Sequence, residues 1–405
     1  MPNKKKKKKQ WVKRRHAVIR NLASFLLSPY IKWKYGIAVE RYKGAKRQYL
    51  IVANHQTAFD QFFIGMAVKG PIYYVASEDI FTNGLSSKLL KWAVAPIPIK
   101  KQATDVQAVL TCKRVVREGG TIALMPEGNR TYSGKTEYFK SAVVGLAKIL
   151  RLPLAFLRIE GGYGVHPRWS DVVRKGKMRA YISKVMEPEE YLALSDDELY
   201  AVMKKELFVD ENTTGGEFFH QKSAEYLERA VYYCPDCGFS TFESRNDTIA
   251  CKKCGKAARY LPDKTFEGID GEFPFKHMGE WYEAQARFIR SFDPSSATEV
   301  PLYEDTVNIF DVFPYKKKVL RAKNAKLALY GNRVVVQTAA GVMEMPFDRV
   351  SVATVLGRNK LNIYFEDKVY QFKGEKRFNA LKYVNVCYRY KSVTKGEGDG
   401  EFLGL

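Results

Sequence analysis

Long hydrophobic runs are missing from this chain of 405 residues, because no stretch of eighteen consecutive uncharged apolar residues occurs. We therefore expect no helix that crosses a membrane and no signal peptide. Acidic residues are also scarce at the front, where residues 1–50 contain sixteen Lys or Arg against one acid, Glu40. The whole chain has a formal charge of +23 and opens with the run Lys4 to Lys9. This block should attract nucleic acid or an anionic lipid surface, with a disordered, solubilising tail as the alternative.

A basic amphipathic helix is expected directly after the lysine run. In residues 11–27 the apolar side chains recur at steps of three and four, while Lys13, Arg14 and Arg20 lie elsewhere on the helical wheel. This pattern is typical of a helix that lies in the lipid interface. We therefore assign residues 1–36 to a basic tail and a membrane-interface helix, with a helix packed on its own domain as the alternative. The apolar residues are Trp11, Val18, Leu22, Phe25 and Leu26.

Residues 37–205 alternate short apolar segments with helical segments. Such alternation indicates one α/β domain with a largely parallel sheet. The predicted strands are residues 49–53, 72–76, 121–125 and 154–159, and the predicted helices include residues 60–68, 104–118 and 140–150.

Cysteine is rare, and four of the six cysteines form two Cys-x-x-Cys pairs separated by thirteen residues. This spacing is typical of a four-thiolate zinc ribbon. Two disulfides are the alternative, but nothing else in the sequence indicates an oxidising compartment. We expect a linker helix and a structural zinc site in residues 206–265, with iron as the less favoured metal. The ligands would be Cys234, Cys237, Cys251 and Cys254, and Cys112 and Cys387 should lie in the core.

The end of the chain has a strand pattern. We expect a helical linker at residues 266–300, a mainly-β domain at 301–393 and a loose tail at 394–405. A series of strands closed by one helix resembles a PH-like or GRAM-like small barrel. The predicted strands lie in residues 326–337, 342–346, 361–365 and 369–372, and the helix carries Phe378, Leu381 and Val384 on one face.

A histidine and an aspartate follow the first predicted strand, where α/β folds place their chemistry. An imidazole held by a carboxylate can take a proton from an alcohol. Five positions of a regular helix rotate by about 500°, so the pair meets only if His55 lies in the loop and Asp60 in the first helical turn. The capping-box spacing of Thr57 and Asp60 favours this arrangement. Taken alone, Asp60 could be only a helix cap and His55 a structural histidine.

A second loop follows the strand predicted at residues 121–125 and should reach the same edge of the sheet. Arg130 offers a planar fork suited to phosphate oxygens, and Gly128 lets the backbone approach a ligand closely. Glu127 could orient Arg130 or the hydroxyls of a substrate, or form a surface ion pair. The segment resembles a P-loop, but five residues rather than four separate Gly128 from Gly134. Nucleotide binding is therefore not expected.

Together the two loops resemble the glycerophospholipid acyltransferase family, whose best-known members are the 1-acylglycerol-3-phosphate acyltransferases. The first family block, Asn-His-x4-Asp, matches Asn54, His55 and Asp60, and the third block matches Met125 to Thr131. The second block usually ends in arginine, and here Lys101 stands in its place. Lysine keeps the charge but lacks the bidentate fork. The resemblance covers roughly residues 45–190.

The resemblance implies a reaction and a place for it. The chain would transfer a fatty acyl group from acyl-carrier protein or acyl-CoA to the sn-2 hydroxyl of lysophosphatidic acid, giving phosphatidic acid without a catalytic cofactor. The basic amphipathic helix and the lack of a spanning segment predict, in addition, a peripheral protein on the cytoplasmic face of the cell membrane. Glycerol-3-phosphate or another lysolipid remains an alternative acceptor. By resemblance, His55 is the general base, Asp60 orients it, and Asn54, Lys101, Glu127, Gly128 and Arg130 bind the substrate.

Two other hypotheses concern the remaining parts of the chain. The lysine tail and the ribbon, with Lys252, Lys253 and Lys256, could bind nucleic acid, which we regard as the less favoured partner. Alternatively, the ribbon and the C-terminal domain bind an acidic carrier protein or an anionic lipid. Under that hypothesis, deleting residues 300–405 weakens binding rather than the chemistry.

Overall fold

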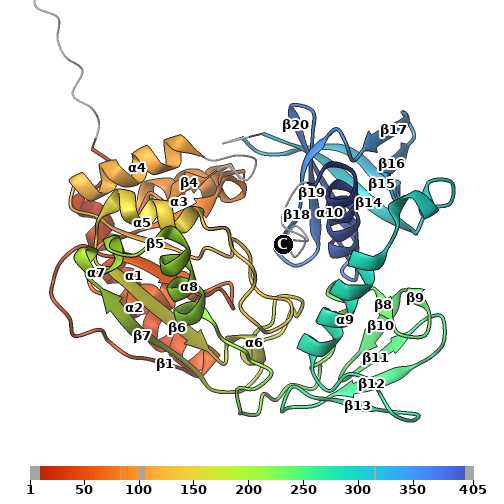
Figure 1. Cartoon of the computed structure of the whole chain (residues 1–405), viewed down its shortest axis with the longest axis horizontal. Helices are drawn as coiled ribbons and strands as arrows, with labels where there is room; N and C mark the ends of the chain where they lie inside the picture. Colours follow the sequence, from red (N-terminus) through yellow and green to blue (C-terminus); the bar gives the residue numbers. More distant parts are fainter. Residues whose placement is uncertain (1–9, 83, 100–104, 314–315, 397–405) are drawn as a thin grey trace, which may run out of the picture.

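The structure, a computed structural model, describes residues 10–82, 84–99, 105–313 and 316–396. Figure 1 shows a layered domain of strands and helices, a small group of strands, and a larger sheet with a helix packed on it. The first is an α/β domain with a largely parallel sheet, the second contains the four clustered cysteines, and the third is the mainly-β C-terminal domain. The predicted fold class is confirmed.

A seven-stranded sheet forms the centre of the first domain. Its strands are β1 Ile37–Val39, β2 Leu50–Ala53, β3 Ile72–Ser77, β4 Ile97–Ile99, β5 Thr121–Leu124, β6 Leu154–Glu160 and β7 Met178–Met186, in the order β1-β7-β6-β2-β5-β3-β4. Every neighbouring pair is parallel except β6 and β7. In β2, Leu50 and Val52 pack into one core while Ile51 and Ala53 pack into another. This is the pattern of a strand buried on both faces, and it explains the continuous apolar run.

Helices cover both faces of this sheet. Two of them, α1 Arg14–Tyr35 and α2 Asp60–Ala67, contribute to the core on one face, whereas α4 Val106–Arg117, α5 Ala142–Leu150 and α8 Asp196–Leu207 contribute to the other. The helices predicted from the sequence are present as α2, α4 and α5. The remaining helices of this domain are η1 Glu78–Phe81, α3 Leu85–Val94, α6 Gly162–Val165 and α7 Pro188–Leu192.

The first helix differs from its prediction in length and in two side chains. It continues beyond residue 27 to Tyr35 and ends at Gly36, whose left-handed φ of 58° suits a helix C-terminus. Trp11 lies outside the helix, and its indole N–H donates to the Ala95 carbonyl at 3.0 Å. Arg20 is not a solvent-facing cation, because it donates to the carbonyls of Gly65 and Val68 near the end of α2. Among the described residues, none of the helices combines the length and apolarity needed to cross a bilayer.

The cysteine region forms its own small sheets. The strands are β8 Tyr233–Cys234, β9 Gly238–Phe239, β10 Phe242–Arg245, β11 Thr248–Cys251, β12 Ala257–Tyr260 and β13 Phe266–Gly268. The first two pair with each other, and the last four form an antiparallel sheet that extends to Gly268. Instead of a linker helix, a single 3₁₀ turn, η2 Leu227–Arg229, precedes them.

The C-terminal domain is a seven-stranded antiparallel sheet with a helix packed on it. It follows α9 Met278–Ser291 and η3 Pro294–Ala297, and its strand order is β17-β16-β15-β14-β20-β19-β18. The segments predicted as strands are present, and the sheet gains β14 and β18 in addition. One hydrophobic cluster continues from the cysteine region through α9 into this sheet. Its elements are β14 Tyr303–Val312, β15 Val319–Leu329, β16 Arg333–Thr338, β17 Gly341–Pro346, β18 Val350–Leu356, β19 Lys360–Phe365, β20 Lys368–Gly374 and α10 Leu381–Lys395.

Candidate active site

His55 and Asp60 meet at the carboxyl end of β2. The Nδ1 atom of His55 lies 2.8 Å from Oδ2 of Asp60, with His55 in the loop and Asp60 at the first position of α2. Asp60 is fully buried, whereas the side chain of His55 is 19% exposed. Because an ionised carboxylate only accepts, Nδ1 carries the proton that is donated to Asp60, and Nε2 keeps its lone pair. The geometry is that of an imidazole oriented to act as a base.

The carboxylate of Asp60 is fixed by the loop itself. It accepts from the backbone N–H groups of Gln56 and Thr57 and from the Thr57 hydroxyl at 2.6 Å. The capping box predicted at Thr57 and Asp60 is only half formed. The Thr57 hydroxyl accepts from Phe59 N–H rather than from the helix, and Phe59 is the N-cap residue, with no side-chain cap bond. Asp60 therefore holds the loop and the imidazole rather than capping a helix.

Asn54 and Glu127 join the site loops to their surroundings. Both amide atoms of Asn54 bond to the main chain of Ile159 at 2.8 Å. Glu127 is buried, and its two oxygens accept from the backbone N–H groups of His55 and Glu137, each at 2.7 Å. Burial raises the pKa of Glu127 well above its ordinary value, and the Glu137 carboxyl adds to the rise. These contacts show that both residues position the loops and that Glu127 is buried rather than part of a surface ion pair. Their contact with substrate stays a prediction.

Gly128 and Arg130 face the same space as His55. Gly128 has a left-handed φ of 68°, which explains glycine at that position, and both residues line the pocket described below. Among the described residues, no acceptor or carboxylate pairs with the guanidinium of Arg130, and its Nη1 atom is buried without a partner. Burial, with the charges of Arg168 and Arg358, lowers the pKa of Arg130 to about 10. An unpaired, partly desolvated arginine is a strong attractor for an anion. Lys101, the other predicted phosphate ligand, lies outside the described residues.

A pocket of about 740 Å³ opens beside this group. Apolar side chains of α1, α2 and β3 form most of its wall, and His55, Asn129 and Arg130 form its polar end. Pockets of this size and character suit a largely hydrophobic ligand with a polar group at one end. The polar residues meet at one place because the loops that follow β2 and β5 leave the sheet side by side.

Two buried groups that the sequence pattern did not reveal support the first loop. Gln56 donates to Glu211 at 3.0 Å, and Glu211 also accepts from the Gly161 N–H. Lys264, in the turn between β12 and β13, lies 3.6 Å from the same carboxylate. These partners are far apart in the sequence, so no local motif marks them.

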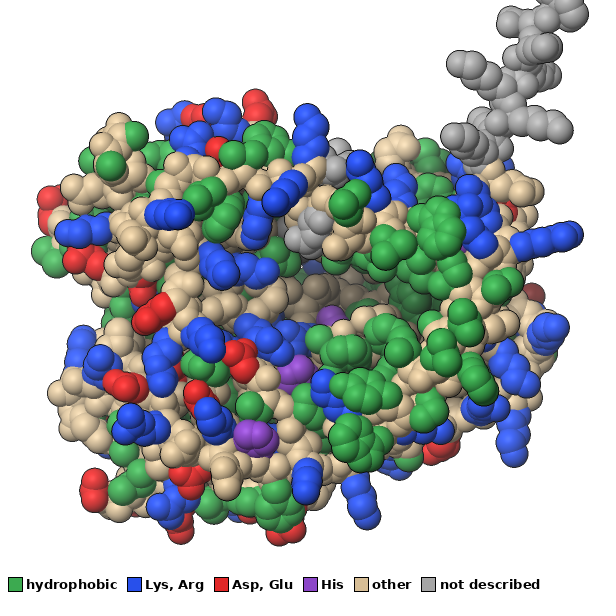
Figure 2. Space-filling view, turned by 180° about the vertical axis from the view of Figure 1, so that it is seen from behind, with side chains coloured by type: hydrophobic (Ala, Val, Ile, Leu, Met, Phe, Trp, Pro, Cys, Tyr) green, Lys and Arg blue, Asp and Glu red, His purple; other side chains and the backbone are tan. Residues whose placement is uncertain are grey.

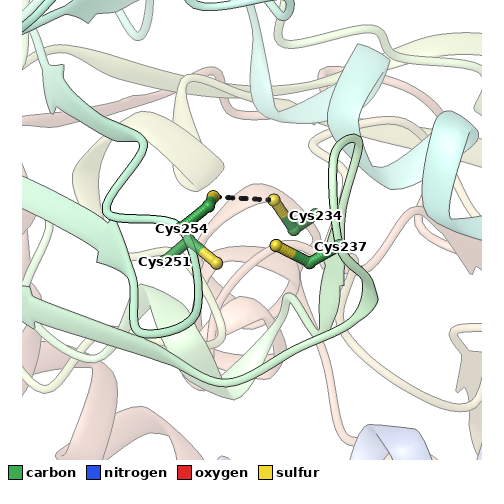
Figure 3. Close-up of side chains that lie close together, drawn as sticks. All are labelled: Cys234, Cys237, Cys251 and Cys254. Atoms are coloured by element: carbon green, nitrogen blue, oxygen red, sulfur yellow. Dashed lines mark hydrogen bonds between the residues drawn. The ribbon is translucent and has the colours of Figure 1, made fainter.

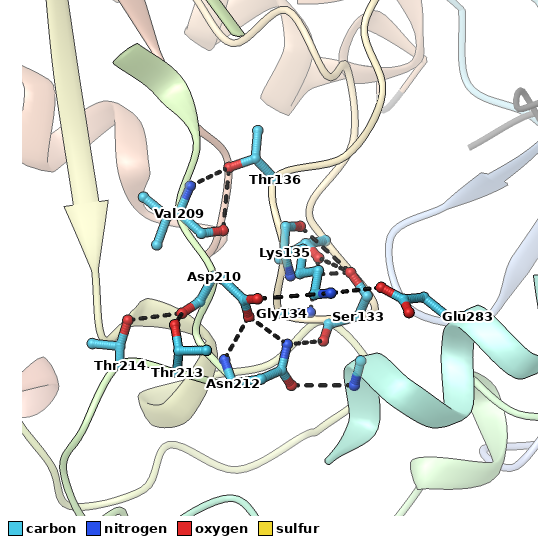
Figure 4. A network of polar contacts seen from close by, with 12 residues as sticks. Ser133, Gly134, Lys135, Thr136, Val209, Asp210, Asn212, Thr213, Thr214 and Glu283 are labelled. Carbon is cyan, nitrogen blue, oxygen red and sulfur yellow. Dashed lines mark hydrogen bonds and ion pairs between the residues drawn. The ribbon is translucent and has the colours of Figure 1, made fainter. Parts of the chain in front are cut away.

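A polar network also ties the second loop to the following parts of the chain (Figure 4). Lys135 forms an ion pair with Glu283 of α9 at 2.5 Å and approaches Asp210 at 3.7 Å. Asn212 donates to the Ser133 carbonyl at 3.3 Å. The segment that resembled a P-loop is therefore a joint between the α/β domain and α9.

The four predicted metal ligands come together (Figure 3). Their sulfur atoms all lie within 4.8 Å of one another, and every one of them is a free thiol. Tetrahedral zinc with Zn–S bonds of about 2.3 Å requires S···S distances near 3.8 Å, and Cys234 and Cys254 are 3.6 Å apart. The donor set fits a structural four-thiolate metal site. Cys112 and Cys387 are buried in the core, as predicted.

Comparison with known proteins agrees with these features. Residues 36–157 match the family model described as Acyltransferase. A 1-acyl-sn-glycerol-3-phosphate acyltransferase of Limnanthes alba is 25% identical over 171 residues, covering 39% of this chain and 56% of that protein. The chloroplastic 1-acyl-sn-glycerol-3-phosphate acyltransferase BAT2 of Brassica napus is 21% identical over 175 residues, covering 42% and 49%. The chain thus spans about half the length of the curated relatives it matches.

Among solved structures, the 1-acyl-sn-glycerophosphate (LPA) acyltransferase PlsC of Thermotoga maritima aligns with a TM-score of 0.39 and 20% identity. The alignment covers 48% of this chain and 81% of that one. The matched family segment contains His55, Asp60 and the loop from Glu127 to Arg130. The first domain of this chain is an acyltransferase-family domain.

Proposed function

We propose that the chain is a peripheral membrane enzyme that transfers a fatty acyl group from a thioester to the sn-2 hydroxyl of lysophosphatidic acid. The product is phosphatidic acid, and the donor is acyl-carrier protein or acyl-CoA. One observation carries the proposal: the His55–Asp60 pair and the unpaired Arg130 share the polar end of one apolar pocket. The names of the curated relatives, 1-acyl-sn-glycerol-3-phosphate acyltransferases, support the same reaction class.

In the proposed reaction, Nε2 of His55 takes the proton of the acceptor hydroxyl as its oxygen attacks the thioester carbonyl carbon. The C–O ester bond forms, the C–S bond breaks, and the thiolate leaves and takes the proton from Nε2. Asp60 stabilises the transient imidazolium and keeps its tautomer. Since Asp60 is held by two backbone amides and the Thr57 hydroxyl, little reorganisation accompanies the proton transfer.

Substrate polarity matches the two ends of the pocket. The apolar wall suits a fatty acyl chain. The phosphate of the acceptor would displace water from Arg130 and supply the missing counter-charge. This pairing explains why a buried cation is left without a protein partner.

Membrane association is proposed from the exposed apolar side chains of α1 and α3, which pack against each other. Figure 2 shows hydrophobic side chains gathered beside a hollow in the molecular surface. On a lipid surface these side chains would be covered, and basic residues would meet anionic headgroups. We place the protein on the cytoplasmic face of the membrane. The most exposed of these residues are Val18 64%, Phe25 78% and Trp33 81% on α1, and Leu85 82% and Leu89 63% on α3.

The reaction is tested by incubating the purified chain with acyl-CoA and acyl-carrier-protein donors against three acceptors: lysophosphatidic acid, glycerol-3-phosphate and lysophosphatidylcholine. We expect labelled acyl chain in phosphatidic acid with at least one donor. Transfer to glycerol-3-phosphate alone, or to lysophosphatidylcholine alone, would mean that this molecule and not lysophosphatidic acid is the acceptor. No transfer to any acceptor would refute the enzyme assignment.

Membrane association is tested by sedimentation with anionic liposomes. Double substitution of Phe25 and Trp33 by aspartate should abolish binding, whereas Val342→Asp, at a 63% exposed residue of the C-terminal domain, is the matched control. A salt-sensitive shift of duplex DNA or RNA without liposome binding would favour a nucleic-acid-binding protein instead.

A further inference from the structure

The C-terminal domain reaches the pocket of the acyltransferase domain. Its hairpin between β18 and β19 turns through Gly357, Arg358 and Asn359, and Leu356, at the end of β18, lines the same pocket as His55. The turn is anchored to its own domain, because the Asn359 amide donates to the carbonyls of Glu375 and Lys376. An anchored turn of the C-terminal domain therefore lies at the site, with Leu356 contributing to the lining of the pocket.

Arg168 fastens this turn to the loop that carries Arg130. It is 1% exposed and donates to the carbonyls of Val355 in β18 and Gly357 on the turn, at 3.0 and 3.1 Å. On the other side it donates to the Arg130 carbonyl at 3.0 Å and to the Asn129 side chain at 3.3 Å. In the described part of the chain no carboxylate pairs with it. Arg168 thus fixes the position of the turn relative to Arg130 and adds a positive charge beside it.

Arg358 stands at the tip of the turn with its guanidinium incompletely satisfied. Its Nη2 donates to His166 Nε2 at 3.0 Å, and its Nη1 lies 3.4 Å from Asp171. Asp171 already accepts two bonds from Arg229, at 2.7 and 3.3 Å. The Nε atom of Arg358 is buried without a partner among the described residues, and the side chain is 34% exposed. Two arginines thus share one carboxylate, which leaves an excess of positive charge.

Histidine 166 fixes the direction of Arg358. A guanidinium only donates, so His166 Nε2 must be the acceptor and the ring must be neutral. Burial, together with the charges of Arg130 and Arg358, lowers the pKa of His166 to about 3, which keeps it neutral. His166 and Arg358 are thereby held in one arrangement.

We propose that the β18–β19 turn completes the acceptor site and that Arg358, together with Arg130, binds the phosphate of an anionic lysolipid. This inference rests on the proposed function, whose acceptor carries a phosphate monoester. Two guanidinium forks from different domains match a dianionic group better than one. It also differs from the hypothesis that the C-terminal domain only binds a carrier protein or an anionic lipid and takes no part in the active site.

The test compares Arg358→Ala and Arg358→Lys with Arg349→Ala in the full chain. Arg349 is a suitable control because it belongs to the same domain, is 57% exposed and forms a surface ion pair with Glu366. Steady-state kinetics are measured with lysophosphatidic acid and with monoacylglycerol, which lacks the phosphate. We expect Arg358→Ala to raise the KM for lysophosphatidic acid by at least about tenfold with little change in kcat, and Arg358→Lys to restore part of the loss. The control should match the parent chain.

A lysophosphatidic acid KM of Arg358→Ala equal to that of the parent would overturn the inference. Equal losses with both acceptors, accompanied by a lower melting temperature, would overturn it in favour of a structural joint. A second readout separates it from the proposed reaction: binding of short-chain lysophosphatidic acid to His55→Ala, with and without Arg358→Ala, by calorimetry. Binding that depends on Arg358, found together with no acyl transfer by the parent chain, would refute the reaction but support this site. Binding that is absent, or that ignores Arg358, would refute the site.

Discussion

The two charged groups at the polar end of the pocket differ in how their charges are satisfied within the protein. Asp60 is fully buried and accepts from the imidazole, two backbone amides and a hydroxyl. Arg130 is partly buried, and its Nη1 has no partner in the described chain. The proton-transfer group is therefore complete before substrate arrives, whereas the anion-binding group is stabilised only by a ligand. A polar group whose hydrogen bonds are made within the protein keeps its geometry, whereas a buried polar group without a partner indicates the charge of the ligand that can bind there.

The largest effect should come from breaking the satisfied group. Asp60→Asn keeps the size of the side chain but places an N–H₂ group among donors, so we expect kcat to fall by about 10³-fold. The free energy of unfolding should also fall, by about 1–3 kcal/mol. Kinetics and urea denaturation measure both. An unchanged kcat would show that the carboxylate does not control the imidazole.

Arg130→Met should lower the activity but raise the stability of the protein. Loss of the guanidinium should lower kcat/KM for lysophosphatidic acid by about 10–100-fold, as for a charge-assisted pair. Because it removes an uncompensated charge from a partly buried site, the free energy of unfolding should rise by about 1 kcal/mol. Arg130→Lys is the control for charge. A variant that loses stability as well would mean that Arg130 already has a protein partner.

Removal of the metal should weaken the binding of lysophosphatidic acid by the arginines more than it slows the proton transfer by His55. The cysteine region shares a hydrophobic cluster with α9 and the C-terminal sheet, which carries Arg358. Treatment with a chelator, or Cys254→Ser, should release about one zinc per chain and raise the KM for lysophosphatidic acid more than it lowers kcat. Elemental analysis and kinetics provide the readouts. An absence of bound metal in freshly purified protein would contradict the ribbon assignment.

The smallest effect should be a dependence of stability on pH at the joint between the domains. The pKa of His166 is lowered from 6.5 to about 3 by burial and neighbouring arginines. Between these values the unfolded chain binds a proton that the folded chain does not, so stability falls as the pH falls below 6.5, by at most about 1.4 kcal/mol per unit. His166→Gln should reduce this slope in urea denaturation at several pH values. An identical slope in the variant would contradict a neutral, buried His166.

The sequence predicted the half of the site that lies within short motifs. His55 and Asp60 are five residues apart, and the buried strand before them sets their place, so both the loop position and the contact could be inferred. Arg168 and Arg358 could not be found in the same way, because the packing of separate domains brings them beside the loop that carries Arg130. Glu127 was assigned to substrate binding by resemblance to the family, whereas its burial and its bonds to two backbone amides depend on the packing of the loop and could not be inferred from the motif.

Similar reasons explain the elements that were missed. Strand β14 has two acidic residues, Glu304 and Asp305, near its start, and it is held between β15 and β20, of which β20 lies far along the chain. The propensity for strand depends on such context. By contrast, β2 is apolar throughout and β5 is apolar after Thr121, as strands with two covered faces require.

The most direct test of this account is acyl transfer to lysophosphatidic acid by the parent chain and by His55→Ala, with the same thioester donor and at equal binding to anionic liposomes. The account predicts phosphatidic acid from the parent and a loss of about 10²–10⁴-fold in kcat for the variant, since the base is removed while the pocket and Arg130 remain. Normal acyl transfer by His55→Ala would contradict it.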